Sequence, residues 1–313
     1  EPGRQFHAVE SRRGRVVGPA MRMLVRPVLE YAPLTTFTLA RLHLFDLVGA
    51  LLPLPRGATA QRRMFSDFDA ELVTGAGVSA TAPNIVLYFH GGGFVCCDID
   101  THDSICSWLA KASHGRVLSV DYRLAPETPF PGQIDDARAA CAWAFQNAVR
   151  FGANPTRIAV AGDSAGAYMA ASAALEINAK TPGAVALQVL LYPLIHVDGV
   201  LWAEEELRNF RFLGRIATLY IARSLGAAMP SLLDIDLAHA PPTIVAGGGA
   251  FDPVRNDTKA FVDRLRKAGV TVIEKKYPFL THGGLNFTAY SKLAVTALQE
   301  VGELIRARLI QAP

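Results

Sequence analysis

The chain has 313 residues, of which 50 % are hydrophobic and 19 % are charged, so it can bury a large core and does not have the composition of a disordered protein. Its 31 basic and 28 acidic side chains leave a net charge of only +3. The basic residues are scattered, apart from Arg12, Arg13 and Arg15 in the terminal segment, so nucleic acid is not expected as a partner.

Residues 1–60 are predicted to form a helix-rich segment. Its most apolar stretch, residues 33–55, contains Arg41, His43 and Asp46 and has prolines at both ends. A membrane span requires about 20 nearly uncharged residues. We therefore interpret this stretch as a buried or cap helix, and we expect no stable membrane insertion.

From about residue 84, short apolar segments alternate with longer helical ones. Strands that alternate with helices, and that show little strict polar alternation, predict a parallel sheet covered on both faces, which makes this an α/β protein. The predicted strands are Ile85–His90, Val117–Asp121, Ile158–Gly162, Leu187–Tyr192, Thr243–Ala246 and Thr271–Tyr277, and the predicted helices are Asp135–Phe151, Ala165–Ala179, Asp257–Ala268 and Ser291–Leu309.

The run His-Gly-Gly-Gly-Phe at residues 90–94 directly follows the first of these strands. Successive glycines leave backbone N–H groups able to point at an anion, as acyl transfer requires where oxygen charge develops. We predict an oxyanion hole made by the amides of Gly92, Gly93 and Ala165. A phosphate loop is disfavoured, because no Gly-Lys-Ser/Thr follows and the spacing of a dinucleotide fingerprint is not evident. His90 is interpreted as a residue that organises this loop rather than as a base.

The four cysteines are Cys96, Cys97, Cys106 and Cys141, and they show no metal-ligand spacing. Adjacent cysteines rarely bridge each other, because disulfide geometry does not fit neighbouring positions. We interpret all four as thiols in a reducing compartment, and we expect a cytoplasmic protein without a metal site.

The strongest local signal is Gly-Asp-Ser-Ala-Gly at residues 162–166, between a predicted strand and an alanine-rich helix. A sharp strand-to-helix turn strains the serine backbone, and only glycines at positions 162 and 166 let the neighbouring backbones approach. The turn projects the hydroxyl above the sheet, near the positive end of the helix. Ser164 is therefore predicted to be a nucleophile rather than a capping serine.

Two further segments can supply its partners. Asp252 and His282 each follow a predicted strand, at the end of the sheet where open α/β folds place their sites. Each residue alone is weak evidence, since Asp before Pro is usually part of a turn or a helix cap. In the order Ser, Asp, His, however, they match the hydrolase pattern.

Taken together, these motifs resemble the bacterial hormone-sensitive-lipase family of esterases and lipases in the α/β-hydrolase superfamily. The resemblance spans roughly residues 65–310. It includes, besides the glycine loop and the elbow, Asp-Tyr-Arg-Leu-Ala-Pro-Glu at residues 121–127, Phe-Pro at 130–131 with Asp135 and Asp136, Asp-Pro at 252–253 and His-Gly at 282–283.

This resemblance implies a mostly parallel, eight-stranded sheet with helices on both faces and a helical cap. The core would comprise residues 61–195 and 231–313, and the cap would comprise residues 1–60 and the insertion 196–230. It also implies hydrolysis of small carboxylic esters with short or medium acyl chains, without a cofactor. Family members often dimerise, so a homodimer is left open.

The resemblance further implies a triad with Ser164 as nucleophile, Asp252 as acid and His282 as base. His282 would take the serine proton during attack on the ester carbonyl, Asp252 would orient the imidazole, and water would then release the acyl-enzyme.

Four side chains are candidate substrate contacts. They are Phe94 and Asp163 beside the motifs, and Trp202 and Phe210 in the insertion. Asp163 is, like Asp121, Arg123 and Glu127, also interpreted as a structural charge near the elbow.

The chain departs from the family pattern at Ala167-Tyr168, where Gly-Asn is common, and at Gly284, where an aromatic residue is common. These changes affect the shape of the pocket more than the chemistry. An amidase or lactonase would use the same triad. A receptor on the same fold is disfavoured, because the related plant gibberellin receptor lacks the histidine that is present here.

Overall fold

The computed structural model describes residues 59–64, 69–75, 77–79, 82–197, 221–222, 224–250 and 252–310. Most of the two expected cap segments, including Trp202 and Phe210, lies outside the described residues. The division into core and cap therefore stays a prediction.

Eight strands form one sheet within the described residues, in the order β1-β2-β4-β3-β5-β6-β7-β8. Only β1 with β2 and β2 with β4 pair in antiparallel fashion, and the other neighbours are parallel, which confirms the expected mostly parallel, eight-stranded sheet. The strands are β1 (Thr59–Met64), β2 (Asp69–Thr74), β3 (Ile85–Phe89), β4 (Arg116–Asp121), β5 (Ile158–Asp163), β6 (Leu187–Leu191), β7 (Thr243–Gly247) and β8 (Val272–Lys276).

Strands β1 and β2 were not among the predicted strands. Their sequences, TAQRRM and DAELVT, contain polar and charged residues instead of a continuous apolar run, and β1 is the edge strand of the sheet. The central strands β3, β5 and β6 are buried along their whole length, which is why their apolar runs were readily identified.

Five long helices pack against the sheet in the described part of the chain. They are α3 (Ile99–Ser113), α4 (Gly132–Asn147), α5 (Ala165–Lys180), α7 (Arg255–Lys267) and α8 (Lys292–Ile310), with short 3₁₀ turns η1 (Val149–Phe151), η2 (Pro155–Arg157) and η4 (Gly284–Asn286). The predicted helix 135–151 is divided, because α4 ends at Asn147 and η1 follows. Helix α3 was missed, since its buried face includes Thr101, His102 and Ser104, which obscure the apolar periodicity.

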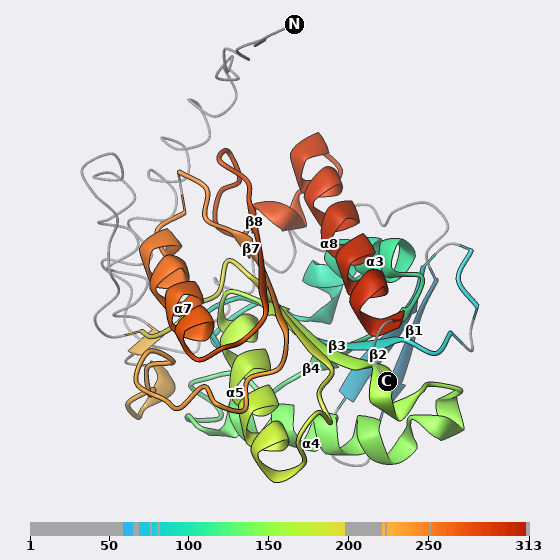
Figure 1. Cartoon of the computed structure of the whole chain (residues 1–313), viewed down its shortest axis with the longest axis horizontal. Coiled ribbons are helices and arrows are strands. Elements are labelled where there is room, and N and C mark those ends of the chain that lie inside the picture. Colours follow the sequence, from blue (N-terminus) through green and yellow to red (C-terminus); the bar gives the residue numbers. More distant parts are fainter. Residues whose placement is uncertain are drawn as a thin grey trace, which may run out of the picture.

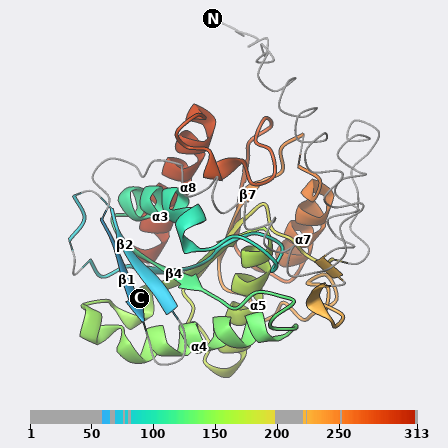
Figure 2. The ribbon, with the colours of Figure 1, turned by 180° about the vertical axis from the view of Figure 1, so that it is seen from behind.

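The helices cover both faces of the sheet (Figures 1 and 2). Helices α3 and α8 pack side by side on one face, and α4 and α5 pack together on the other with α7. Each face has its own apolar cluster: Leu109 and Val301 belong to one, and Met169 and Phe261 to the other. The α/β architecture inferred from the alternation of elements is therefore confirmed.

The cysteines lie in separate environments. The sulfur atoms of Cys96 and Cys97 are 4.0 Å apart, well beyond the length of a disulfide bond. Cys106 and Cys141 are buried in opposite core clusters, one on each face of the sheet. Among the helices that the structure describes, none is long and apolar enough to cross a membrane.

A buried polar cluster ties the two sides of the 198–220 segment to the core. His196 Nε2 lies 2.8 Å from Asp257 Oδ1 in the first turn of α7, and Ser231 Oγ lies 3.1 Å from His196 Nδ1. Nearby, Tyr168 Oη donates to the carbonyl of Pro230 at 2.8 Å. The chain on both sides of this segment is thus anchored to α5 and α7, which flank the carboxyl edge of the sheet.

Burial predicts that two valine truncations differ strongly in their effect on stability. Val301, a residue of α8, is fully buried, whereas Val149 is 75 % exposed. We expect Val301→Ala to lower the free energy of unfolding by about 2 kcal/mol, through lost burial and a residual cavity. The matched change Val149→Ala should stay within about 0.5 kcal/mol. Urea denaturation monitored by circular dichroism measures both, and equal effects would contradict the assigned packing of α8.

Candidate active site

Ser164 occupies the sharp turn between β5 and α5. Its backbone has φ 50° and ψ −116°, a left-handed conformation that a serine rarely adopts and that costs of order 1–3 kcal/mol. Neighbouring hydrogen bonds maintain this conformation: its amide donates to the carbonyl of Leu191 at 3.0 Å, and its own carbonyl accepts from Leu194 at 3.0 Å. The predicted elbow is therefore present, with Ser164 at its apex.

The two glycines of the elbow are required by close packing. A Cβ atom at Gly166 would collide with the carbonyl group of Phe89 at the end of β3, and one at Gly162 would collide with the backbone of Gly166. Hydrogen at these positions lets α5 begin directly above β3 and β5. The steric reason inferred for the Gly-x-Ser-x-Gly pattern thus holds in this fold.

The glycine loop lies beside the elbow and turns tightly. Gly92 and Gly93 have φ values of 117° and 63°, and the Gly92 carbonyl accepts from the amides of Val95 and Cys96, each at 3.2 Å. No hydrogen bond occupies the amides of Gly92, Gly93 or Ala165 within the part of the chain that the structure describes. Within the described residues, this arrangement is compatible with the predicted oxyanion hole.

The segment after β4 supports this loop. Tyr122 donates its hydroxyl to the carbonyl of His90 at 2.8 Å, and the two rings stack at 4.2 Å between centroids. His90 Nδ1 lies 2.7 Å from the carbonyl of Gly91, and Phe94 O accepts from Ala125 at 2.8 Å. His90 is fully buried by these contacts. Its position fits the interpretation of His90 as a loop-organising residue.

The loops that carry Asp252 and His282 pack directly against each other. A Cβ atom at Gly249 would collide with the carbonyl of Leu280, and Ala250 N donates to the carbonyl of Pro278 at 2.8 Å. The glycine run at residues 247–249, a weak signal in the sequence, therefore allows the acid loop to approach the histidine loop closely.

Ser164, His282 and Asp252 form a continuous chain of hydrogen bonds. His282 Nε2 lies 2.8 Å from Ser164 Oγ, and His282 Nδ1 lies 3.0 Å from Asp252 Oδ1. The same carboxylate oxygen accepts from the amide of Val254 at 3.0 Å. The Asp252 side chain is buried, whereas that of His282 is 29 % exposed. The structure brings together the three residues that the sequence separates by 88 and 30 positions, as their numbers show.

The environment of His282 favours its cation. Burial opposes protonation, but the charge of Asp252 and the hydrogen bond to it outweigh this effect, and Asp163 adds to it, so the pKa of His282 is raised above its ordinary value. The ring of Tyr192 packs on the imidazole with 5.0 Å between centroids. Tyr192 is itself fully buried and holds a left-handed backbone (φ 33°). It therefore restricts the orientation of the histidine ring.

Asp163 lies beneath the glycine loop rather than in open space. It is 2 % exposed, and its Oδ1 atom accepts from Tyr88 Oη at 2.7 Å and from the Gly91 amide at 2.8 Å. His102 Nε2 is 3.3 Å from the same oxygen. All these contacts are with protein groups, which agrees with the structural interpretation of Asp163.

Phe94, also expected to contact substrate, is fully buried in the described core and packs edge-on against Tyr168 at 6.0 Å. The other two expected contacts, Trp202 and Phe210, lie outside the described residues. Sequence reasoning overlooked Tyr88, Tyr192 and His102. The signal that could have found His102 is the helix start before it, where Asp98 and Thr101 form a capping box.

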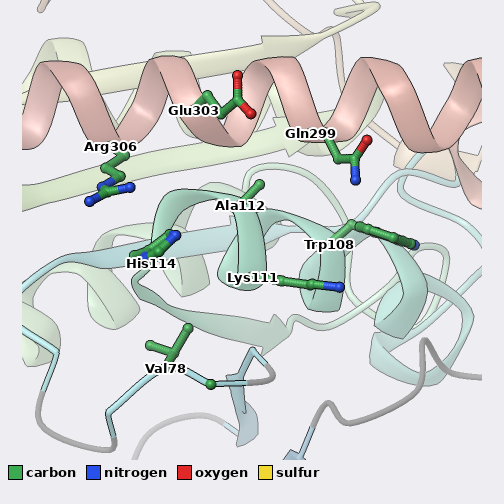
Figure 3. A pocket seen from close by; sticks show the side chains of 9 residues that line it. Val78, Trp108, Lys111, Ala112, His114, Gln299, Glu303 and Arg306 are labelled. Carbon is green, nitrogen blue, oxygen red and sulfur yellow. The ribbon is translucent and has the colours of Figure 1, made fainter.

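Two surface hollows are lined by different segments of the described chain. One, of about 280 Å³, lies between α3 and α8 and is lined by Trp108, Lys111, His114, Glu303 and Arg306 among others (Figure 3). None of the expected site residues lines it, and Lys111, 5.0 Å from the centre of the Trp108 ring, lies in the last turn of α3, where a cation offsets the helix dipole. We assign no ligand to this hollow.

The other hollow, of about 300 Å³, is lined by aliphatic and small side chains, together with polar backbone atoms. The lining residues are Val197, Ala222, Leu225, Gly226, Ala227, Ala228 and Met229. Ile221, the neighbour of Ala222, lies so close to Gly93 that a Cβ atom there would be 2.6 Å from Ile221 Cδ1. This hollow is thus adjacent to a segment that contacts the glycine loop.

Comparison with known proteins identifies the family. Residues 86–286 match the α/β hydrolase fold family. The carboxylesterase NlhH of Mycobacterium tuberculosis is 35 % identical over 224 residues, which cover 68 % of this chain and 70 % of that protein. The esterase LipI of the same organism is 37 % identical over 227 residues, which cover 70 % of each protein.

Solved structures agree with this assignment. An esterase from the bacterial hormone-sensitive lipase family shares 27 % identity with a TM-score of 0.77, over 93 % of this chain and 98 % of that one. Sequence, fold and site motifs therefore lead to one conclusion: the chain belongs to the α/β hydrolase fold family, within the group of esterases that resemble hormone-sensitive lipase.

Proposed function

We propose that this protein is a serine esterase that hydrolyses carboxylic esters with short or medium acyl chains. The observation that carries the proposal is the chain from Ser164 Oγ through His282 to Asp252, with distances of 2.8 and 3.0 Å. The names of the relatives, a carboxylesterase and an esterase, support the same reaction class.

The proposed mechanism gives each group a step. His282 Nε2 takes the proton of Ser164 as Oγ attacks the ester carbonyl, and Asp252 keeps the proton of His282 on Nδ1 and stabilises the imidazolium. The oxyanion accepts hydrogen bonds from the amides of Gly92, Gly93 and Ala165. His282 then protonates the departing alcohol, and it deprotonates the water that attacks the acyl-enzyme. The helix dipole of α5 adds positive potential at the oxyanion.

The acyl chain of the substrate would occupy the hollow beside Ile221. Its lining offers aliphatic side chains and small residues, and its volume of about 300 Å³ suits a short or medium chain better than a long one. Burial of each additional CH₂ group contributes about 0.8 kcal/mol until the hollow is full. The preferred acyl length would therefore test whether the acyl chain lies in this hollow.

Removing the nucleophile provides the first test. Ser164→Ala should lower kcat by about 10⁶-fold, because the attacking oxygen is lost. Ser172→Ala, a matched change further along α5, should retain activity. Hydrolysis of nitrophenyl esters from acetate to palmitate measures both variants, and we expect the rate to decline toward palmitate.

Two results would contradict the proposal. If Ser164→Ala were as active as the unmodified protein, another group would be the nucleophile. If the unmodified protein cleaved no ester of the series but cleaved the matching anilides, the enzyme would be an amidase.

The raised pKa of His282 predicts the pH dependence. Only neutral imidazole can accept the serine proton, so activity is lost as the pH falls through the pKa of His282, and this loss should begin above the ordinary value of 6.5. Asp252→Asn removes the charge that favours the cation. It should lower kcat by about 10⁴-fold and shift the acidic midpoint of kcat/KM to lower pH.

Asp263→Asn is the matched control, since Asp263 is exposed on α7 and pairs with Lys259. A rate that stayed flat from about pH 5 to 9 would count against His282 as the base.

A further inference from the structure

A second histidine–aspartate pair lies buried on the other side of the elbow. The side chains of His102 on α3 and Asp163 at the end of β5 are 2 % and 3 % exposed, and His102 Nε2 is 3.3 Å from Asp163 Oδ1. Asp163 immediately precedes Ser164. The same Oδ1 atom also accepts hydrogen bonds from the hydroxyl of Tyr88 and the amide of Gly91, so one buried carboxylate oxygen accepts two hydrogen bonds and lies at ion-pair distance from His102.

The surroundings of His102 Nδ1 favour a proton on this nitrogen. Thr101 Oγ1 is 2.9 Å away, but its shorter contact, at 2.7 Å, is with the carbonyl of Asp98, which can only accept. The Asp98 carbonyl is itself 3.3 Å from Nδ1. With the Thr101 hydroxyl donating to that carbonyl, both neighbours of Nδ1 are acceptors, while Nε2 lies at ion-pair distance from the Asp163 carboxylate. An imidazole that carries a proton on both nitrogens is the cation.

Other groups approach Nε2 without changing this conclusion. The Gly91 amide is 3.3 Å from Nε2, but its shorter bond, at 2.8 Å, goes to Asp163. Asn286 reaches Nε2 from η4 with its side-chain nitrogen at 3.4 Å. Its Oδ1 atom is buried and has no partner among the described residues, so a turned amide would accept from Nε2.

Electrostatics agrees with the geometry. Burial lowers the pKa of His102, but the charge of Asp163 and the hydrogen bond to it raise it to about 9. Burial also opposes ionisation of Asp163, yet the charge of His102 and the hydrogen bonds from His102 and Tyr88 hold its pKa below the ordinary value. Burial and the nearby cation lower the pKa of His90 to about 4, so that ring stays neutral.

We propose that His102 is a positioning residue for the glycine loop: as an imidazolium ion it compensates the buried charge of Asp163, and the compensated carboxylate holds the Gly91 amide and with it Gly92 and Gly93. This inference rests on the proposed function, in which the amides of Gly92 and Gly93 bind the oxyanion. An unpaired buried carboxylate is strongly unfavourable, so loss of the cation would make Asp163 draw in water while it stays ionised. This change weakens the acceptor that anchors Gly91.

The pair also affects the pKa of the proposed base, His282. Asp163 raises the pKa of His282. A cation beside Asp163 should offset part of that effect, because its charge has the opposite sign. Without His102 the negative charge of Asp163 would act on His282 alone. The acidic limb of the pH–rate profile would then move to higher pH, a shift that simple loosening of the fold would not produce.

The charge of His102 also depends on pH on the alkaline side of neutrality. Because the pKa of His102 is raised in the folded protein, its cation is present below about pH 9 and is lost as the pH rises through that value. The groups that face His102 are Asp163 from β5, Tyr88 from β3, His90 from the glycine loop, Cys97 and Asp98 before α3, and Asn286 from η4. Burial and Asp163 raise the pKa of Tyr88 well above 10, so it remains neutral.

The test compares His102→Gln, Asp163→Asn and the double variant. The control is His239→Gln, a change at an exposed histidine. His102→Gln should lower kcat by about 10- to 100-fold, a fraction of the loss caused by removing an oxyanion donor, with little change in KM. The double variant should recover about tenfold of this loss, because asparagine offers Tyr88 and Gly91 an acceptor without a buried charge. His102→Gln alone should raise the acidic midpoint of kcat/KM.

A measurement on the unaltered side chain keeps the inference separate from folding and from catalysis. The ¹⁵N shifts of the His102 ring, recorded in the unmodified protein and in Ser164→Ala, should show both nitrogens protonated at neutral pH and a titration near pH 9. A neutral His102 overturns the inference even in a fully active esterase. So does a double variant no more active than His102→Gln. Absence of ester hydrolysis by the unmodified protein would instead overturn the proposed function, and would leave the titration intact.

Discussion

Close packing at the end of β3 sets the arrangement of the whole site. The carbonyl of Phe89 lies where a side chain at Gly166 would be, so α5 can begin over the sheet only if hydrogen stands at that position. The consequence is the left-handed backbone of Ser164, which a helix start would not otherwise require. The strain is maintained because the Ser164 amide and carbonyl are both bonded to the chain around β6. Nucleophile, oxyanion amide and helix dipole are thus placed by one steric constraint.

A histidine–aspartate pair lies on each side of this elbow, and the two pairs differ in burial. Asp252 and His282 form the partly exposed pair, in which the histidine must lose and regain a proton during turnover. Asp163 and His102 form the buried pair, in which both charges persist and the carboxylate anchors the loop. The difference follows from burial and pairing: Asp163 is buried, accepts two hydrogen bonds and lies beside His102, whereas the side chain of His282 is partly exposed.

Aromatic residues connect these two pairs to the core. Tyr88 fixes Asp163, Tyr122 stacks on His90, and Tyr192 packs on His282, and all three are buried. Two of them lie at or just beyond the carboxyl end of a strand, and Tyr88 lies one residue before such an end. The loops of the site are therefore held by side chains that the sheet itself positions, which is how flexible segments acquire a defined geometry.

The sequence by itself determined the fold class, the central strands and most helices, because continuous apolar runs and helical periodicity arise from local chemistry. It also determined the elbow, since Gly-x-Ser-x-Gly between a strand and a helix has one steric explanation. Only the tertiary structure decided that Asp252 and His282 join Ser164 in one site, because hydrogen bonds across 30 and 118 positions leave no local pattern. The same holds for His102 and Tyr192, whose polar atoms and rings gain their roles from neighbours on other strands. The helix α3 escaped the sequence pattern for a related reason: its buried polar residues have partners that only folding brings together. Strands β1 and β2 escaped it because their sequences contain no continuous apolar run.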